Sequence, residues 1–215
     1  MRISKKEERE GTIPVWAREE LALRKVMGQW IERSIAKQRH IPYQGGKTGH
    51  DEGSFTASWC GYHLLTGEPK VMEFMRDLRD QYLDYSEKYQ VHGYDGWGEV
   101  HHQTEHYMIF LTRLWHLDKS DHATINAIED AAHHAGNWVP GIPEWYDWEN
   151  HRFRSWSLGT RLVQDYPPFD FNVPDHFKVI QMVLSAYLAT GKERYLELCC
   201  DYSDMWTDLI LKADD

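Results

Sequence analysis

Two stretches of this chain share one pattern: LLTGEPKVMEFMRDLRD, residues 64–80, and LATGKERYLELCCDYSD, residues 188–204. At an offset of 124 residues, apolar positions fall on apolar positions and acidic positions on acidic ones, as Glu73 does on Glu197. Each stretch also carries the same Thr-Gly pair before its longer apolar pattern. Because both faces and the turn agree, the sequence predicts a repeated hairpin of two antiparallel helices.

The rest of the chain also has helical spacing, because apolar residues recur three and four positions apart and no segment alternates convincingly with period two. The predicted fold class is all-α, with antiparallel helical hairpins. We expect a solvated lead-in at residues 1–13 and a single domain over residues 14–215. Helices are predicted at residues 15–38, 53–65, 68–89, 100–117, 120–137, 175–189 and 192–212.

Composition excludes several classes of partner. The net charge of −10 comes without a Lys/Arg cluster, which argues against nucleic acid. No apolar run approaches the ~20 residues of a membrane helix, and no apolar segment follows the N-terminal charges as in a secretory signal. Three cysteines cannot form a disulfide framework. A cytoplasmic protein without membrane contact is predicted.

The connections between the predicted helices fall into two groups. Since a short connection makes consecutive helices antiparallel, the tight turns should gather at one end of the array. These turns are Thr66-Gly67, Leu117-Asp118 and Thr190-Gly191. The long connections should then lie at the opposite rim, where loops of this length are usually functional. They span residues 40–52, 90–99 and 139–174.

The connection at residues 90–99 brings acidic groups to this rim. Asp95 and Glu99 precede a predicted helix, and Glu52 comes from another rim connection. Two carboxylates facing each other across a cleft can serve as general acid and as base or nucleophile at a glycosidic bond. In the alternative interpretation, Asp95 or Glu99 only caps the following helix and complements its dipole.

Aromatic side chains are concentrated in the same connections. A flat ring offers an apolar face to a sugar, and a guanidinium group between such rings can hold a carboxylate by paired hydrogen bonds. The alternative is that the loops pack their own aromatic rings over the helix ends. The candidate substrate-binding residues are Trp97, His50, Trp145, Trp148, Arg152 and Trp156.

The stretch HQTEH, residues 102–106, matches a zinc-binding pattern. His102 and His106 would share one face of a helix, and Glu105 could polarise a metal-bound water. The competing interpretation is an amphipathic helix with hydrogen-bonded histidines near the rim, and we expect no resident metal. We also expect no cofactor, because GGKT at residues 45–48 lacks the first glycine and the preceding strand of a phosphate loop.

The helix ends YLATG and HLLTG, followed by KERYLE and EPKVME, resemble the six-hairpin (α/α) toroids of glycoside hydrolases and polysaccharide lyases. The resemblance covers residues 53–212. It implies an oligo- or polysaccharide substrate, bound in a cleft at the rim that carries the long loops. For a hydrolase it implies that Asp95, Glu99 and Glu52 are the catalytic carboxylates.

For a lyase, the resemblance implies that Tyr94 or His102 abstracts a proton and that Arg152 neutralises the developing charge. The chain departs from the family in length, because at ~50 residues a hairpin it supplies only three to four of six hairpins. We therefore expect self-association into a homo-oligomer or a C-terminal continuation. A helical-repeat module that binds a protein partner without catalysis is the alternative from another functional class.

Overall fold

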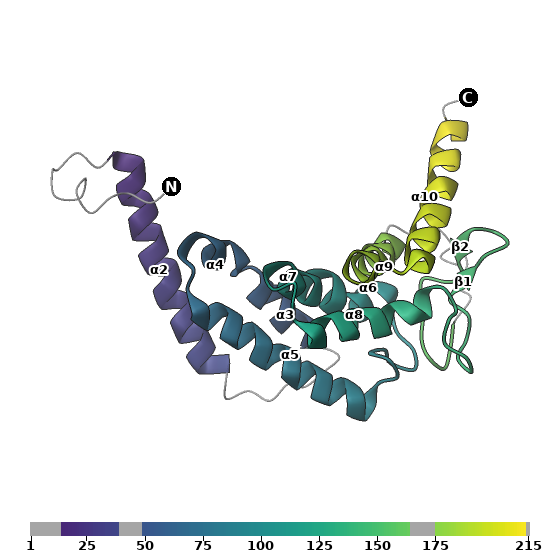
Figure 1. The fold of residues 1–215 in the computed structure, drawn as a ribbon, viewed down its shortest axis with the longest axis horizontal. Helices are drawn as coiled ribbons and strands as arrows, with labels where there is room; N and C mark the ends of the chain where they lie inside the picture. The colour runs from purple at the N-terminus through teal and green to yellow at the C-terminus, as the bar shows by residue number, and fades with distance from the viewer. Residues whose placement is uncertain (1–13, 39–48, 164–174, 214–215) are drawn as a thin grey trace.

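The computed structural model describes residues 14–38, 49–163 and 175–213, without the side chains of residues 49, 50, 100, 101 and 103. The predicted lead-in lies outside these residues. Helices dominate the structure, as predicted (Figure 1). They are α2 (Val15–Gln38), α3 (Gly49–Ala57), α4 (Cys60–Thr66), α5 (Pro69–Tyr89), α6 (Val100–Glu105), the π-helix η1 (His106–Leu111), α7 (Thr112–Leu117), α8 (His122–Ala135), α9 (His176–Thr190) and α10 (Glu193–Ala213).

Two details differ from the sequence prediction. The helix expected at residues 53–65 is divided into α3 and α4, because the chain turns at Ser58 and buries the Trp59 ring, which is 1% exposed. A small antiparallel hairpin also forms within the long connection, with Tyr146–Asp147 (β1) opposite Arg152–Phe153 (β2). Two residues per strand are too few to produce a visible alternation of apolar and polar positions.

The two helical hairpins predicted from the repeat have the same turn. Gly67 and Gly191 both adopt a φ of 69°, and each donates its N–H over 2.7 Å to the carbonyl four residues earlier. The preceding threonines, Thr66 and Thr190, both donate their hydroxyl to the carbonyl of residue i−4. Left-handed backbone at the glycine ends one helix and redirects the chain into the next. The local turn chemistry is therefore repeated along with the sequence.

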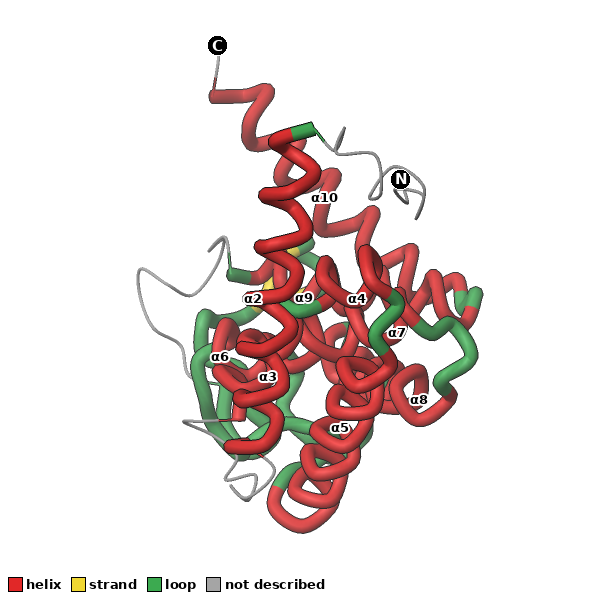
Figure 2. The backbone as a smooth tube through the Cα atoms, turned by 90° about the vertical axis from the view of Figure 1, so that its left-hand side faces the viewer, coloured by secondary structure: helices red, strands yellow, loops and turns green. Residues whose placement is uncertain are grey.

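The helices pack into a two-layered array. In one layer α3 contacts α6 and η1, and these contact α9 (Figure 2). The other layer contains α5 and α8. α5 lies against α3, α4 and α7, and α8 lies against α7 and α9. Ion pairs tie α5 to the next turn, since Arg76 contacts Asp118 and the buried Arg79 contacts Asp121. These contacts agree with the prediction that the first two tight turns lie at one end.

Aromatic rings fill much of the core. Tyr82 donates or accepts a 2.5 Å hydrogen bond with Tyr107, and the Tyr107 hydroxyl also donates to the Gly93 carbonyl over 3.0 Å. A Cβ on Gly93 would lie 1.5 Å from the Tyr107 hydroxyl, so this position requires glycine. Rings this large bury much apolar area while their polar tips fix the neighbouring backbone. The core thereby anchors the beginning of the connection at residues 90–99.

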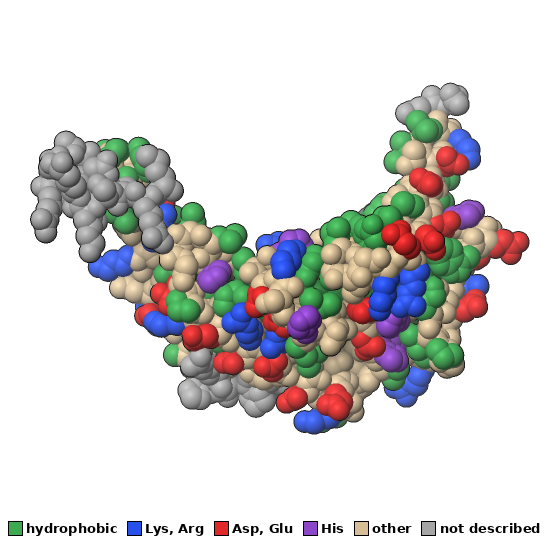
Figure 3. Space-filling view, in the orientation of Figure 1, with side chains coloured by type: hydrophobic (Ala, Val, Ile, Leu, Met, Phe, Trp, Pro, Cys, Tyr) green, Lys and Arg blue, Asp and Glu red, His purple; other side chains and the backbone are tan. Residues whose placement is uncertain are grey.

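The ends of the array stand out from this body. α2 and α10 project from opposite ends of the molecule (Figure 1), and apolar side chains are visible on both projections (Figure 3). Within the described ranges, every helix is too short or too polar to cross a lipid bilayer.

Candidate functional site

Two long connections meet at a backbone junction, which we call the loop clamp: residues 95–99 and 157–162. The Asp95 carbonyl accepts hydrogen bonds from the Thr160 N–H and hydroxyl, at 3.0 and 3.1 Å. The Gly98 carbonyl accepts from the Leu158 N–H at 3.1 Å. The predicted meeting of these two connections is confirmed. The remaining part of the predicted rim, residues 40–48, lies outside the described residues.

Glycines make the loop clamp possible. A Cβ on Gly159 would lie 2.4 Å from the Gly96 carbonyl oxygen, and one on Gly96 would lie 2.2 Å from the Arg161 Nε. At Gly159 the neighbouring atoms are backbone, so only a residue without a side chain allows the two chains to approach this closely; at Gly96 they belong to the Arg161 side chain. The Trp97 backbone lies in this junction while its side chain remains 51% exposed. The clamp therefore positions the backbone of an exposed aromatic residue.

Glu99 begins the helix that leaves the loop clamp. It occupies the N-cap of α6, yet its side chain makes no capping hydrogen bond. Its Oε2 instead lies 3.4 Å from the Nε2 of His102, whose side chain is 50% exposed. The prediction that Glu99 only caps the helix is therefore too simple.

Glu52 and Asp95 occupy different surroundings. Burial, followed by repulsion from Asp51, raises the pKa of the half-buried Glu52 carboxyl. α3 holds this residue close to η1, because a Cβ on the next residue, Gly53, would lie 3.0 Å from the Phe110 Cβ. Asp95 is half-buried and its Oδ1 accepts a 3.2 Å hydrogen bond from the Gln90 amide. Asp95 thus stabilises its own loop, whereas burial makes the Glu52 carboxyl harder to ionise than an exposed one.

Two candidate site residues lie inside the protein rather than at its surface. Tyr94 is 0% exposed, and its hydroxyl donates to the Met182 sulfur at 3.2 Å. Burial raises its pKa well above the usual value, which is the opposite of what a proton-abstracting base requires. Trp145 is 1% exposed and donates from its Nε1 to the Gly159 carbonyl. The prediction of surface roles for Tyr94 and Trp145 is therefore wrong. Both side chains are buried, and Trp145 hydrogen-bonds to the loop clamp at Gly159.

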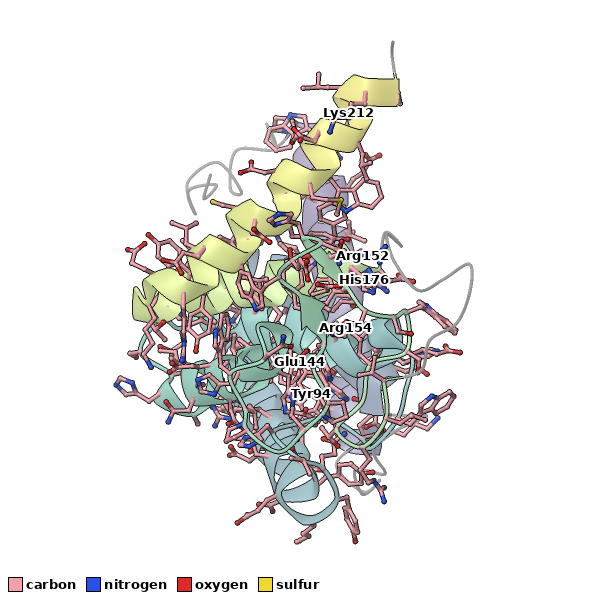
Figure 4. All side chains as sticks on the ribbon, turned by 90° about the vertical axis from the view of Figure 1, so that its right-hand side faces the viewer. Tyr94, Glu144, Arg152, Arg154, His176 and Lys212 are labelled. Carbon is pink, nitrogen blue, oxygen red and sulfur yellow. The ribbon has the colours of Figure 1, made fainter. Side chains whose placement is uncertain are left out.

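The other predicted binding residues are distributed along the same connection. Trp148 is 39% exposed, and its Nε1 donates to the Gly136 carbonyl; Trp156 is half-buried and packs against the core. Arg152 is half-exposed on β2. Figure 4 shows Arg152 near His176, and Arg154, which follows β2, nearer to Glu144, with which it pairs at 2.6 Å. His50 falls in α3, and its side chain lies outside the described part of the structure.

The alternative zinc site is not assembled in the described residues. His106 is 8% exposed and stacks on Tyr82 with ring centroids 4.4 Å apart, whereas His102 faces solvent. Glu105 lies 3.7 Å from the Lys178 ammonium group. Residues 14–38, 49–163 and 175–213 contain no group of three or more metal-ligating side chains placed to hold an ion. We therefore do not carry the zinc interpretation further.

Sequence reasoning missed two histidine–aspartate pairs. His92 Nδ1 lies 2.6 Å from Asp130 Oδ1, and His151 Nδ1 lies 2.7 Å from Asp201 Oδ1. Both histidines have positive φ, 50° and 55°, a conformation that is uncommon outside glycine. Each pair borders a groove, of about 530 Å³ beside Asp130 and about 410 Å³ beside Asp201. The partners are 38 and 50 residues apart, so no local motif marks them.

Each histidine–aspartate pair joins a loop to a helix. The second Asp201 oxygen accepts a 2.6 Å hydrogen bond from the Tyr146 hydroxyl, so α10 is tied to both strands of the β1–β2 hairpin region. The first pair ties the loop that precedes the clamp to α8. Both pairs therefore help to position the connections that form the clamp.

No protein family, curated protein or solved structure matches this chain.

Proposed function

We propose that the protein binds a carbohydrate at the loop clamp and hydrolyses a glycosidic bond there. The observation that supports this most strongly is Trp97, an aromatic ring half exposed on a backbone junction that leaves no space for a side chain at Gly159. A preorganised aromatic face stacks on the C–H face of a sugar with little loss of side-chain entropy.

The proposed chemistry uses a carboxyl group of α3 and one at the start of α6. Hydrolysis requires one carboxyl group that is protonated at working pH and one that is ionised. Glu52, whose pKa is raised by burial, suits the general acid. Glu99, paired with His102, suits the base or nucleophile. With Tyr94 buried, elimination by a lyase route would depend on His102 as the base.

The helix packing supports the toroid part of the proposal. In a partial (α/α) toroid, α3 with α4, α6 to α7, and α9 would form the inner layer. The outer layer would contain α2, α5, α8 and α10. The contacts of α3 with η1, and of α6 and η1 with α9, agree with neighbouring inner helices. In such an array the connections at one rim form the cleft, which is where the loop clamp would lie.

Binding and cleavage can be tested together. The protein is incubated with a panel of polysaccharides while reducing ends and the absorbance of unsaturated uronates are followed, and binding is measured by affinity electrophoresis. Trp97→Ala should weaken binding by about tenfold or more, the effect of losing one stacked ring. Trp97→Phe is the matched control, since it keeps an aromatic ring at the same position.

The catalytic assignment has its own variants. Glu52→Gln and Glu99→Gln should each lower turnover by at least about a hundredfold while polysaccharide binding is retained. Glu19→Gln, an exposed change on α2, is the control. Absence of both binding and turnover across the panel, or equal loss in Trp97→Ala and Trp97→Phe, would remove the proposal.

A second candidate function is a helical-repeat module that binds another protein without catalysis. The exposed apolar residues of α2 favour it, because monomeric proteins rarely expose a large contiguous apolar patch. The two candidates separate experimentally, since an interaction module would bind its partner equally well when Glu52 and Glu99 are replaced.

A further inference from the structure

α2 has two apolar faces. One packs on the protein through Ala17, Ile31 and Ile35, all of which are buried. A second face, which we call the α2 stripe, is solvent-exposed. With a rotation of about 100° per residue, its side chains cover a sector of about 100° around the helix axis. The stripe consists of Val15, Trp16, Leu23, Val26 and Trp30, which are 62%, 56%, 59%, 59% and 42% exposed. The Trp30 ring at its end also contacts Phe55 and Trp59. A surface helix packed against a single core needs only one apolar face, so the stripe indicates another contact.

α9 also has a second apolar face, on the opposite end of the array. Phe177, Leu184 and Leu188 follow one another at seven and four residues, the spacing of one helix face. They are 42%, 38% and 59% exposed, and the Phe177 ring also contacts Tyr202 and Trp206 of α10. The core face of the same helix is buried. We call this line the α9 stripe.

The internal repeat explains what the α9 stripe is shaped to contact. At the offset of 124 residues, Phe177, Leu184 and Leu188 correspond to Gly53, Cys60 and Leu64. In the first repeat the beginning of this line is covered, because Gly53 packs directly on Phe110 of η1 and Cys60 is 8% exposed, whereas Leu64 at its end is 73% exposed. In the second repeat the whole equivalent line is partly exposed. The part of the α9 stripe formed by Phe177 and Leu184 therefore has the position of a face against which a further helix packs.

Charge separates the two ends of the array. α2 contains five Lys or Arg residues against three Glu residues. α10, which is adjacent to α9, contains five Asp or Glu residues against two Lys or Arg residues. Opposite charge on two surfaces favours their encounter and disfavours the pairing of either surface with itself. This complementarity selects α2 as the helix that suits the α9–α10 end.

We propose that two copies of this chain associate head to tail, with the α2 stripe of one copy packed on the α9 stripe of the other. The contact extends the helical array from one copy to the next. It uses two different surfaces, so it is heterologous and leaves one stripe free at each end of a dimer. Further copies can then add until a ring closes or a filament forms.

The first test is the mass of the wild-type protein by light scattering after size-exclusion chromatography over a wide concentration range. The expected result is a mass above that of the monomer that rises with concentration and falls at high salt, because salt screens the charge attraction. A monomeric mass at every concentration and salt level would overturn the proposal.

The second test separates the two surfaces. One variant carries Trp16→Glu with Leu23→Glu, and the other carries Leu184→Glu with Leu188→Glu. Each variant alone should be monomeric. Because each keeps one intact stripe, an equimolar mixture should form a 1:1 dimer that does not grow further. Self-association of either variant alone, or no dimer in the mixture, contradicts a head-to-tail contact.

Controls distinguish loss of contact from loss of folding. Tyr89→Glu changes a side chain on α5 that is 69% exposed, and this variant should associate as the wild type does. The milder changes Leu23→Ala and Leu188→Ala, at side chains that are each 59% exposed, should weaken association by about tenfold without altering thermal unfolding. Wild-type association by both alanine variants would also count against the proposal.

Discussion

The α4–α5 and α9–α10 hairpins share their turn but not their surroundings. Gly67 and Gly191 have the same φ and the same 2.7 Å hydrogen bond. α5 is nevertheless covered by neighbouring helices and paired with them through Arg79, whereas the equivalent Ser203 on α10 is exposed. Local sequence therefore determines how each hairpin turns. Its place in the array determines which of its faces are buried.

The largest expected difference concerns Arg79. This side chain is 9% exposed and contacts Asp121, whose side chain is 6% exposed. Arg79→Met should destabilise the protein by about 3–5 kcal/mol, because it leaves a buried carboxylate without its counter-charge. Ser203→Ala, at the equivalent position, should change stability by less than about 0.5 kcal/mol. Urea unfolding measures both, and similar losses would contradict the comparison.

The second difference concerns the helices that precede the two turns. At the offset of 124 residues, His176 at the start of α9 corresponds to Glu52 in α3. Burial lowers the pKa of His176 to about 4, and its Nε2 lies 2.8 Å from the Ser155 carbonyl. The unfolded chain then binds a proton below about pH 6.5 that the folded protein excludes. Stability due to this neutral histidine is therefore complete above pH 6.5 and is lost as the pH falls.

Between pH 7 and pH 4 this loss should reach about 3 kcal/mol for His176. His176→Gln removes the titrating group while an amide can still donate to Ser155, so its stability should depend less steeply on pH. Urea unfolding at a series of pH values gives the two slopes. Equal slopes for the wild type and His176→Gln would contradict the assignment.

Replacing the glycine at either hairpin turn, Gly67 or Gly191, should lower stability by a smaller amount that is equal for the two turns. A Cβ on Gly67 or on Gly191 would have no atom within 4 Å, so alanine is strained there only by its backbone. Gly67→Ala and Gly191→Ala should each destabilise by about 1 kcal/mol, the usual cost of a left-handed non-glycine residue. Thermal unfolding of the two variants should agree closely. A marked difference would show that the turns are not energetically equivalent.

The smallest effect is expected at the projecting end of α10. Leu211 is 65% exposed, so Leu211→Ser should change the stability of the monomer by less than about 0.5 kcal/mol. The measurement is urea unfolding at low protein concentration. A loss above ~1 kcal/mol would mean that this end of α10 is buried against another part of the protein.

Much of the fold follows from periodicity and turn chemistry. The helix predicted at residues 15–38 has those bounds, and the one predicted at 100–117 spans α6, η1 and α7. Both depend on apolar spacing that is visible in a single segment. The break at Ser58 and the π-helix could not be predicted this way, because the packing of Trp59 and Phe110 against distant residues decides them.

The candidate site was harder to predict than the fold. Sequence indicated that the connections at 90–99 and 139–174 would meet, since this follows from helix direction. It could not indicate which aromatic rings turn inward. Trp97 is exposed whereas Trp145 is buried, although both lie in polar, glycine- or proline-containing segments. Ring orientation depends on which neighbour supplies a hydrogen-bond acceptor, such as the Gly159 carbonyl for Trp145.

The π-helix η1 changes the rotation of α6 relative to α7 within one continuous helical segment. Its wider turn holds one more residue than an ordinary α-helical turn, so it offsets α6 from α7 by about 100° of rotation. Deleting a single residue from His106–Leu111 would restore a regular helix and rotate everything before it relative to everything after it. Glu99 and His102 would then point elsewhere, with every hydrogen bond of the remaining helix intact. The orientation of the Glu99–His102 pair thus depends on the residue count of the helix as well as on its contacts.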